Sequence, residues 1–115
     1  MALIGLVSDS HGEWLRTRKA MDLLRSKQCE RILHMGDVET HEVLDALAGN
    51  CVTMVFGNCD YVSGLYDYAV SLGLDVQHPA GLITIDEKRI AFLHGDDNSQ
   101  FQKFSNDDSI EVVVY

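Results

Sequence analysis

The sequence predicts an α/β fold in which a parallel β-sheet is followed by an antiparallel hairpin. Between residues 3 and 56, three short apolar runs alternate with two stretches of helical periodicity. Strand–helix–strand alternation of this kind produces parallel strands with right-handed crossovers. Beyond residue 80, two apolar segments flank Asp86-Glu87-Lys88 with no helix between them, which indicates a hairpin.

The first strand is expected at Leu3–Val7, a continuous apolar run typical of a strand covered on both faces. A helix should begin at Glu13 and face the core with one stripe, formed by Trp14, Thr17, Met21 and Leu24. The second strand is expected at Arg31–Met35 and ends in Gly36-Asp37.

A second helix should follow, with Gly49 as its C-terminal cap and an inner face of Val43, Leu44, Leu47 and Ala48. The third strand is expected at Cys51–Phe56. The remaining elements are the hairpin strands Leu82–Ile85 and Arg89–Leu93, a short helix at Gln100–Phe104 and a last strand at Ile110–Tyr115.

Composition limits the function classes. The 115 residues, 46% of them apolar, suit one soluble domain spanning residues 1–115. A net charge of −9 disfavours non-specific binding to nucleic acid or anionic membranes. The three cysteines lack CxxC spacing, which favours reduced thiols and a cytoplasmic location. The N-terminal apolar run is too short for a membrane span and lacks the basic start of a signal peptide.

Polar residues follow the predicted strands at the points where those strands end: Asp9, His11, Asp37, Asn58 and His94. Ligands of open α/β sheets bind at this edge, where strand ends converge. Each residue alone has an ordinary explanation as a turn, cap or structural residue. Together, two carboxylates, two imidazoles and an amide oxygen predict a site for manganese, iron, zinc or nickel.

These motifs resemble one known family. Asp9-x-His11, Gly36-Asp37, Gly57-Asn58-Cys59-Asp60 and His94-Gly95, in this order, are similar to the motifs of calcineurin-like metallophosphoesterases, and the closest likeness is to their small prokaryotic phosphodiesterase branch. The resemblance implies an αββα sandwich, in which two β-sheets are flanked by helices. It also implies hydrolysis of small phosphodiesters by a hydroxide held between two divalent metal ions, for which we expect manganese, with iron, nickel or zinc as alternatives.

The resemblance also implies a role for each site residue. Asp9 and His11 would bind the first metal, and the carboxylate of Asp37 would bridge both metals. Asn58 and His94 would bind the second metal, and Asn58 would also contact substrate.

Two neighbours of Asn58 are further candidates for the catalytic machinery. Cys59 stands where larger family members carry a histidine that protonates the leaving group. Because a thiol is a weak acid, with a reference pKa of about 8.5, we expect diesters or activated esters as substrates. Asp60 is expected to orient the loop or a water molecule, although a plain turn residue is about equally compatible with the sequence.

The family's last motif, Gly-His-Thr-His, normally follows a strand like Ile110–Tyr115 and supplies one histidine to each metal. The 115 residues do not include it, so the domain is expected to be C-terminally truncated, with weakened metal binding or only one metal. The alternative function is a catalytically weak or inactive relative that binds metal or phosphate and associates as a homodimer. A fragment of a longer enzyme is a third interpretation.

Overall fold

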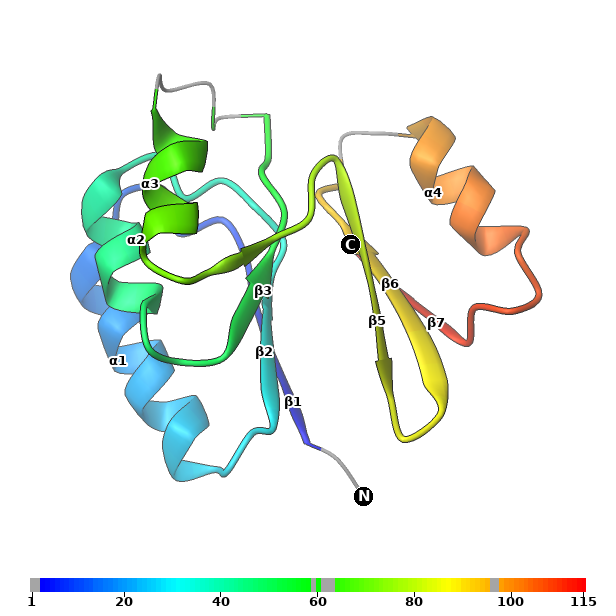
Figure 1. The fold of residues 1–115 in the computed structure, drawn as a ribbon, viewed down its shortest axis with the longest axis horizontal. Helices are drawn as coiled ribbons and strands as arrows, with labels where there is room; N and C mark the ends of the chain where they lie inside the picture. Colours follow the sequence, from blue (N-terminus) through cyan, green and yellow to red (C-terminus); the bar gives the residue numbers. More distant parts are fainter. Residues whose placement is uncertain (1–2, 59, 61–63, 96–97) are drawn as a thin grey trace.

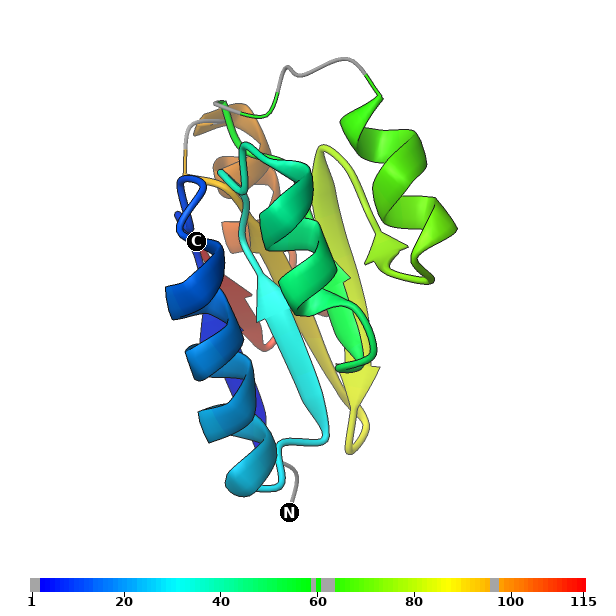
Figure 2. The same cartoon turned by 90° about the vertical axis from the view of Figure 1, so that its left-hand side faces the viewer.

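The computed structural model describes residues 3–58, 60, 64–95 and 98–115. Its first sheet is parallel, with strands in the order β1-β2-β3-β4. These strands are β1 (Ile4–Val7), β2 (Arg31–His34), β3 (Val52–Met54) and β4 (Asp75–Val76). Three helices join them and cover one face of the sheet: α1 (Trp14–Ser26), α2 (His41–Leu47) and α3 (Leu65–Ser71) (Figures 1 and 2).

The second sheet has the strand order β5-β6-β7 and faces the uncovered side of the first (Figure 1). Its strands β5 (Ala80–Ile85) and β6 (Lys88–Leu93) form the predicted antiparallel hairpin, and β7 (Val112–Val114) pairs in parallel with β6. Helix α4 (Asn98–Ser105) lies on the outer side of this sheet (Figure 1). The layers confirm the αββα sandwich.

Two apolar cores hold these layers together. On β2, Ile32 packs with the helices and the adjacent Leu33 packs between the two sheets, as the period of two along a strand requires. The helix-side core is built mainly on Met21, Val43, Leu44, Leu47, Val52 and Met54. The core between the sheets consists of Leu33, Met35, Val55, Ile83, Ile90 and Phe92. Because β2 is buried on both faces, Ile32 and Leu33 are both apolar although they point to opposite faces.

The hairpin connection follows from its backbone conformation. Asp86 and Glu87, the two residues between the paired Ile85 and Lys88, have φ angles of 52° and 66°. Positive φ at both central residues is the requirement of a type I′ turn, whose twist matches that of the flanking strands. The Asp-Glu-Lys signal in the sequence therefore marked the turn correctly.

Some sequence-based expectations were wrong. Strand β1 is not covered on both faces: it lies at the end of the strand order, and Leu6 is 52% exposed. Trp14, predicted to face the core, is 45% exposed because it begins α1, at the margin of the helix layer. Helix α3 and strand β4 were not predicted. None of the helices in the described ranges has both the length and the apolar character needed to cross a membrane.

Candidate metal centre

The carboxyl ends of three strands carry the candidate site. Asp9 follows β1, Asp37 follows β2 and His94 directly follows β6 of the second sheet. Backbone hydrogen bonds from Asp9 N to Gly36 O, and from His11 N to Asp37 O, each 2.9 Å long, hold the loop after β1 against the loop after β2. The two sheets therefore deliver side chains from distant parts of the sequence to one rim.

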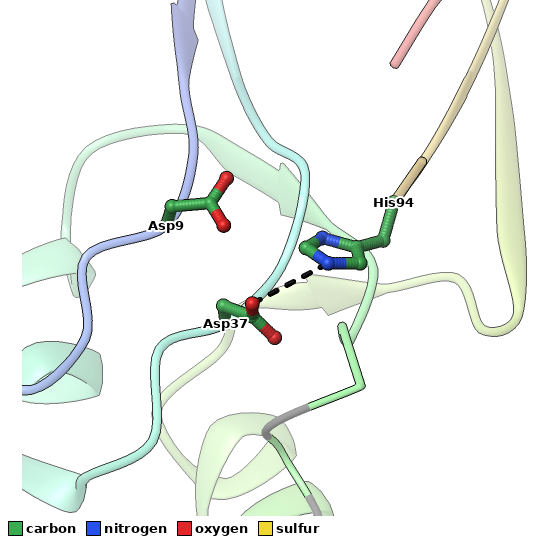
Figure 3. A group of neighbouring side chains, drawn as sticks. All are labelled: Asp9, Asp37 and His94. Atoms are coloured by element: carbon green, nitrogen blue, oxygen red, sulfur yellow. Dashed lines mark ion pairs between the residues drawn. The ribbon is translucent and has the colours of Figure 1, made fainter. Parts of the chain in front are cut away.

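Asp37 is at the centre of the site (Figure 3). It is only 3% exposed, and its Oδ2 lies 3.3 Å from His94 Nε2 and 3.9 Å from His11 Nε2. Asp9, Asp37 and His94 each offer one ligand atom within 4.8 Å of the others. One carboxylate thus reaches both imidazoles, which is the placement that a bridging ligand needs.

The remaining candidates lie beside these three residues. His11 Nε2 is 3.4 Å from Asp9 Oδ1, and Asn58 Oδ1 is 2.8 Å from His94 Nε2. The structure therefore brings Asp9, His11, Asp37, Asn58 and His94 together. Cys59, the candidate proton donor, lies outside the described residues.

The donor set fits divalent cations. His94 Nδ1 lies 2.8 Å from the carbonyl oxygen of Met35, which can only accept a hydrogen bond, so Nδ1 carries the proton. In a neutral ring, Nε2 then presents its lone pair to the oxygens of Asp37 and Asn58. Lone pairs that point at one another repel unless a proton or a cation lies between them. Imidazole nitrogen, carboxylate oxygen and amide oxygen are all suitable ligands for a divalent metal.

His11 is oriented in the same way by Glu39, a residue that no sequence motif marks as a candidate. Its Nδ1 hydrogen-bonds Glu39 Oε2, which leaves Nε2 facing Asp9 and Asp37. A carboxylate behind a metal-binding imidazole fixes the ring and its tautomer. The only signal in the sequence was an acidic residue two positions after Asp37.

Two pKa shifts describe the electrostatics of the rim. The pKa of Asp9 is lowered, chiefly by the hydrogen bond that it accepts from the Ser8 hydroxyl. The pKa of His11 is raised, chiefly by its hydrogen bond to Glu39. Asp9 is therefore ionised at neutral pH. His11 holds a proton more strongly than a histidine in free solution does, so a metal ion that binds His11 has to displace that proton.

Asp60 connects the loops that carry the site. Its buried carboxylate accepts hydrogen bonds from three backbone amides, those of Asp37 (2.7 Å), Glu39 (2.8 Å) and Gly57 (2.9 Å). The first two amides follow β2 and the third follows β3. Asp60 thus links the Asp37 loop to the Asn58 loop, and its orienting role in the site stays a prediction.

Gly57 leaves room for Asp37. A Cβ at this position would overlap Asp37 Oδ1 and lie 2.8 Å from Asp37 N, a backbone atom that cannot move aside easily. We expect Gly57→Ala to displace the carboxylate and weaken Mn²⁺ binding about 10–100-fold, the size of effect known for residues that support ligands. Isothermal titration of the metal-free protein with Mn²⁺ measures this.

Gly95→Ala is the matched control for that variant. Gly95 also adjoins a site residue, but a Cβ there would meet only Tyr115 Cδ2, at an ordinary 3.7 Å. Its Mn²⁺ affinity should equal that of the unmodified protein. Equal losses in the two variants would show that crowding of Asp37 is not the cause.

Comparisons with known proteins agree with this architecture. A family model described as the calcineurin-like phosphoesterase superfamily domain matches residues 2–115. A structure of an archaeal phosphodiesterase is similar, with a TM-score of 0.84 and 22% identity, over 97% of this chain and 70% of that one. No curated protein matches the sequence significantly.

Two bacterial structures are similar over shorter shares of their own length. YfcE, a phosphoesterase from E. coli, matches with a TM-score of 0.65 and 20% identity, over 81% of this chain and 57% of that one. An uncharacterized Streptococcus pneumoniae protein, predicted to be a phosphoesterase, matches with a TM-score of 0.61 and 25% identity, over 89% and 52%. The chain thus spans little more than half of these two proteins.

The family model, together with this fold, defines the class of the protein as a phosphoesterase. This chain belongs to the calcineurin-like phosphoesterase superfamily, whose model covers nearly all of it.

Proposed function

We propose that this protein is a metal-dependent phosphodiesterase acting on small phosphodiesters. The observation that carries the proposal is the placement of Asp37 Oδ2 within 4 Å of both His11 Nε2 and His94 Nε2. Family membership supports a phosphoesterase, and the similar archaeal structure is that of a phosphodiesterase.

Each residue has a proposed role in this site. Asp9 and His11 would hold one cation, Asn58 and His94 a second, and Asp37 would contact both, with Mn²⁺ as the preferred ion. When bound, paired divalent metals lower the pKa of water and neutralise the charge of a phosphate group. Without them, the acidic rim would repel a phosphate anion.

The protein's own side chains prepare this chemistry. Glu39 and the Met35 carbonyl hold the two imidazoles with Nε2 turned inward. Burial of Asp37 limits its contact with water, which strengthens its interaction with nearby positive charge. The Asn58 side chain is exposed, so it is accessible to substrate and is proposed to contact it.

An assay with an aryl phosphodiester and added Mn²⁺ tests the function. We expect turnover that falls at least about 100-fold in Asn58→Ala, because both a metal ligand and a substrate contact are lost. Asn106→Ala is the control, since Asn106 lies on an exposed turn after α4 and should not affect turnover. Activity that survives Asn58→Ala unchanged would come from a contaminating enzyme and would contradict the proposal.

The same assay distinguishes the substrate class and the alternative function. Position 59 carries a thiol, not an imidazole, so we expect aryl diesters to be cleaved faster than alkyl phosphomonoesters, whose leaving groups need a proton. The reverse order would exclude the diester preference. Mn²⁺ binding without any turnover would indicate the inactive metal-binding relative.

A further inference from the structure

A buried histidine that the proposed reaction does not use lies directly behind the site. His34 ends β2 and is completely buried. It points to the helix-covered face of the sheet, because Ile32, two residues earlier, packs against the helices. Burying a polar ring is costly unless its nitrogens are hydrogen-bonded. Both ring nitrogens of His34 have partners.

The partners determine the tautomer. Nδ1 accepts a hydrogen bond from the backbone amide of Gly36, at 3.0 Å. Because that amide can only donate, Nδ1 carries no proton and the ring is neutral, with its hydrogen on Nε2. The Nε2–H group then donates to Ser10 Oγ, 2.8 Å away. One imidazole therefore links the loop after β2 to the loop after β1.

Electrostatics keep the ring neutral. Burial lowers the pKa of His34 to about 4, against the opposing attraction of Asp9 and Asp37 and with a smaller contribution from His94. At neutral pH, Nδ1 of His34 is therefore unprotonated and can accept the hydrogen bond from the Gly36 amide.

Ser10 is the centre of a strained segment. Its side chain is buried, whereas those of the flanking Asp9 and His11 are exposed at the rim. Asp9 and His11 have φ angles of 56° and 43°, in the left-handed region that is strained for residues other than glycine. Such a conformation persists only where the surroundings enforce it. Backbone bonds hold Asp9 and His11, and the side-chain bond from His34 holds the residue between them.

We propose that His34, as the neutral Nε2–H tautomer, is a positioning residue that fixes the Asp9–His11 loop through Ser10 and thereby sets the two side chains that would bind the first cation. This inference rests on the metal site proposed above. It predicts that the bond to Ser10, more than the bond to Gly36, controls metal affinity.

The metal-free protein gives the first test. Long-range ¹H–¹⁵N spectra of histidine side chains should show His34 with an unprotonated Nδ1 and a slowly exchanging Nε2–H. In Ser10→Ala, this proton should exchange faster, and the amide signals of residues 9–11 should shift. A proton on Nδ1, or unchanged signals for residues 9–11 in Ser10→Ala, would overturn the inference.

Variants of His34 separate the two bonds. An asparagine side chain can accept from Gly36 but is too short for Ser10, whereas a glutamine amide reaches Ser10 and gives up the Gly36 bond. We expect about a 10-fold or greater loss of Mn²⁺ affinity in His34→Asn and in Ser10→Ala, no additional loss in the double variant, and a smaller loss in His34→Gln. If the His34 variants fail to fold, Ser10→Ala and the spectra still decide.

Thr17→Val controls for the loss of a buried polar contact. Thr17 is 3% exposed and its hydroxyl donates to the carbonyl of Glu13, the residue before α1, so this change should lower stability without changing Mn²⁺ affinity. Equal losses of Mn²⁺ affinity in Thr17→Val and Ser10→Ala would show that the His34–Ser10 bond has only a general structural role. That result would overturn the proposal. Absence of Mn²⁺ binding by the unmodified protein would refute the metal site instead, and the metal-free spectra would still decide the role of His34.

Discussion

Replacing Asp37 with alanine is expected to lower Mn²⁺ affinity by at least about 100-fold and to abolish phosphodiester turnover. Loss of a group that only supports a ligand typically costs 10–100-fold, and Asp37 Oδ2 itself lies within 4 Å of Nε2 of both His11 and His94. Removing it takes away a carboxylate that His11 and His94 share. Metal content after dialysis against Mn²⁺, together with titration calorimetry, measures the effect.

Two further variants make this result interpretable. Asp37→Asn keeps the side-chain shape beside Gly57 but removes the charge, so it should fold like the unmodified protein and still lose most of its Mn²⁺ affinity. Asp108→Ala removes the same charge from an exposed loop far along the sequence and should bind Mn²⁺ normally. Metal content equal to the unmodified protein in both Asp37 variants would rule out the two-cation site.

The rim was predictable because strand ends carry a strong signal. A buried parallel strand appears in the sequence as a mainly apolar run, and Arg31–Met35 and Cys51–Phe56 are each followed by a glycine and then a polar residue. Once the strands are parallel, their carboxyl ends must meet at one edge. Asp37 and Asn58 could therefore be placed together without coordinates.

The supporting groups were less predictable, because their partners depend on tertiary contacts between loops. His34 follows two apolar residues in β2, and nothing in the sequence shows that Ser10, 24 residues earlier, would accept its hydrogen bond. Glu39 is similarly unremarkable until the β1 and β2 loops are brought side by side. The exposure of Leu6 also depended on strand order, which periodicity does not determine.

Asp60→Asn is expected to destabilise the protein by about 2–4 kcal/mol, because it removes charged acceptors from buried amide donors, each of which costs about 1–3 kcal/mol when left unpaired. The side-chain oxygen of an asparagine could still accept a hydrogen bond from some of these amides, but its NH₂ group would then face the N–H of another. This loss is a large share of a typical total stability of 5–15 kcal/mol. Urea unfolding of the metal-free protein measures it.

Asp107→Asn is the matched control for Asp60. Asp107 also accepts a backbone hydrogen bond, from Ser109 N at 2.9 Å, but it is exposed, so water can replace the lost acceptor and the cost should stay below about 1 kcal/mol.

Turnover at saturating Mn²⁺ then separates two roles of Asp60. If Asp60 only positions the loops, excess metal should restore most of the turnover of Asp60→Asn; if it contacts the reacting groups, turnover should remain low at any metal concentration. The Asp60 oxygens already accept hydrogen bonds from the backbone amides of Asp37, Glu39 and Gly57. We therefore expect excess Mn²⁺ to restore turnover in Asp60→Asn.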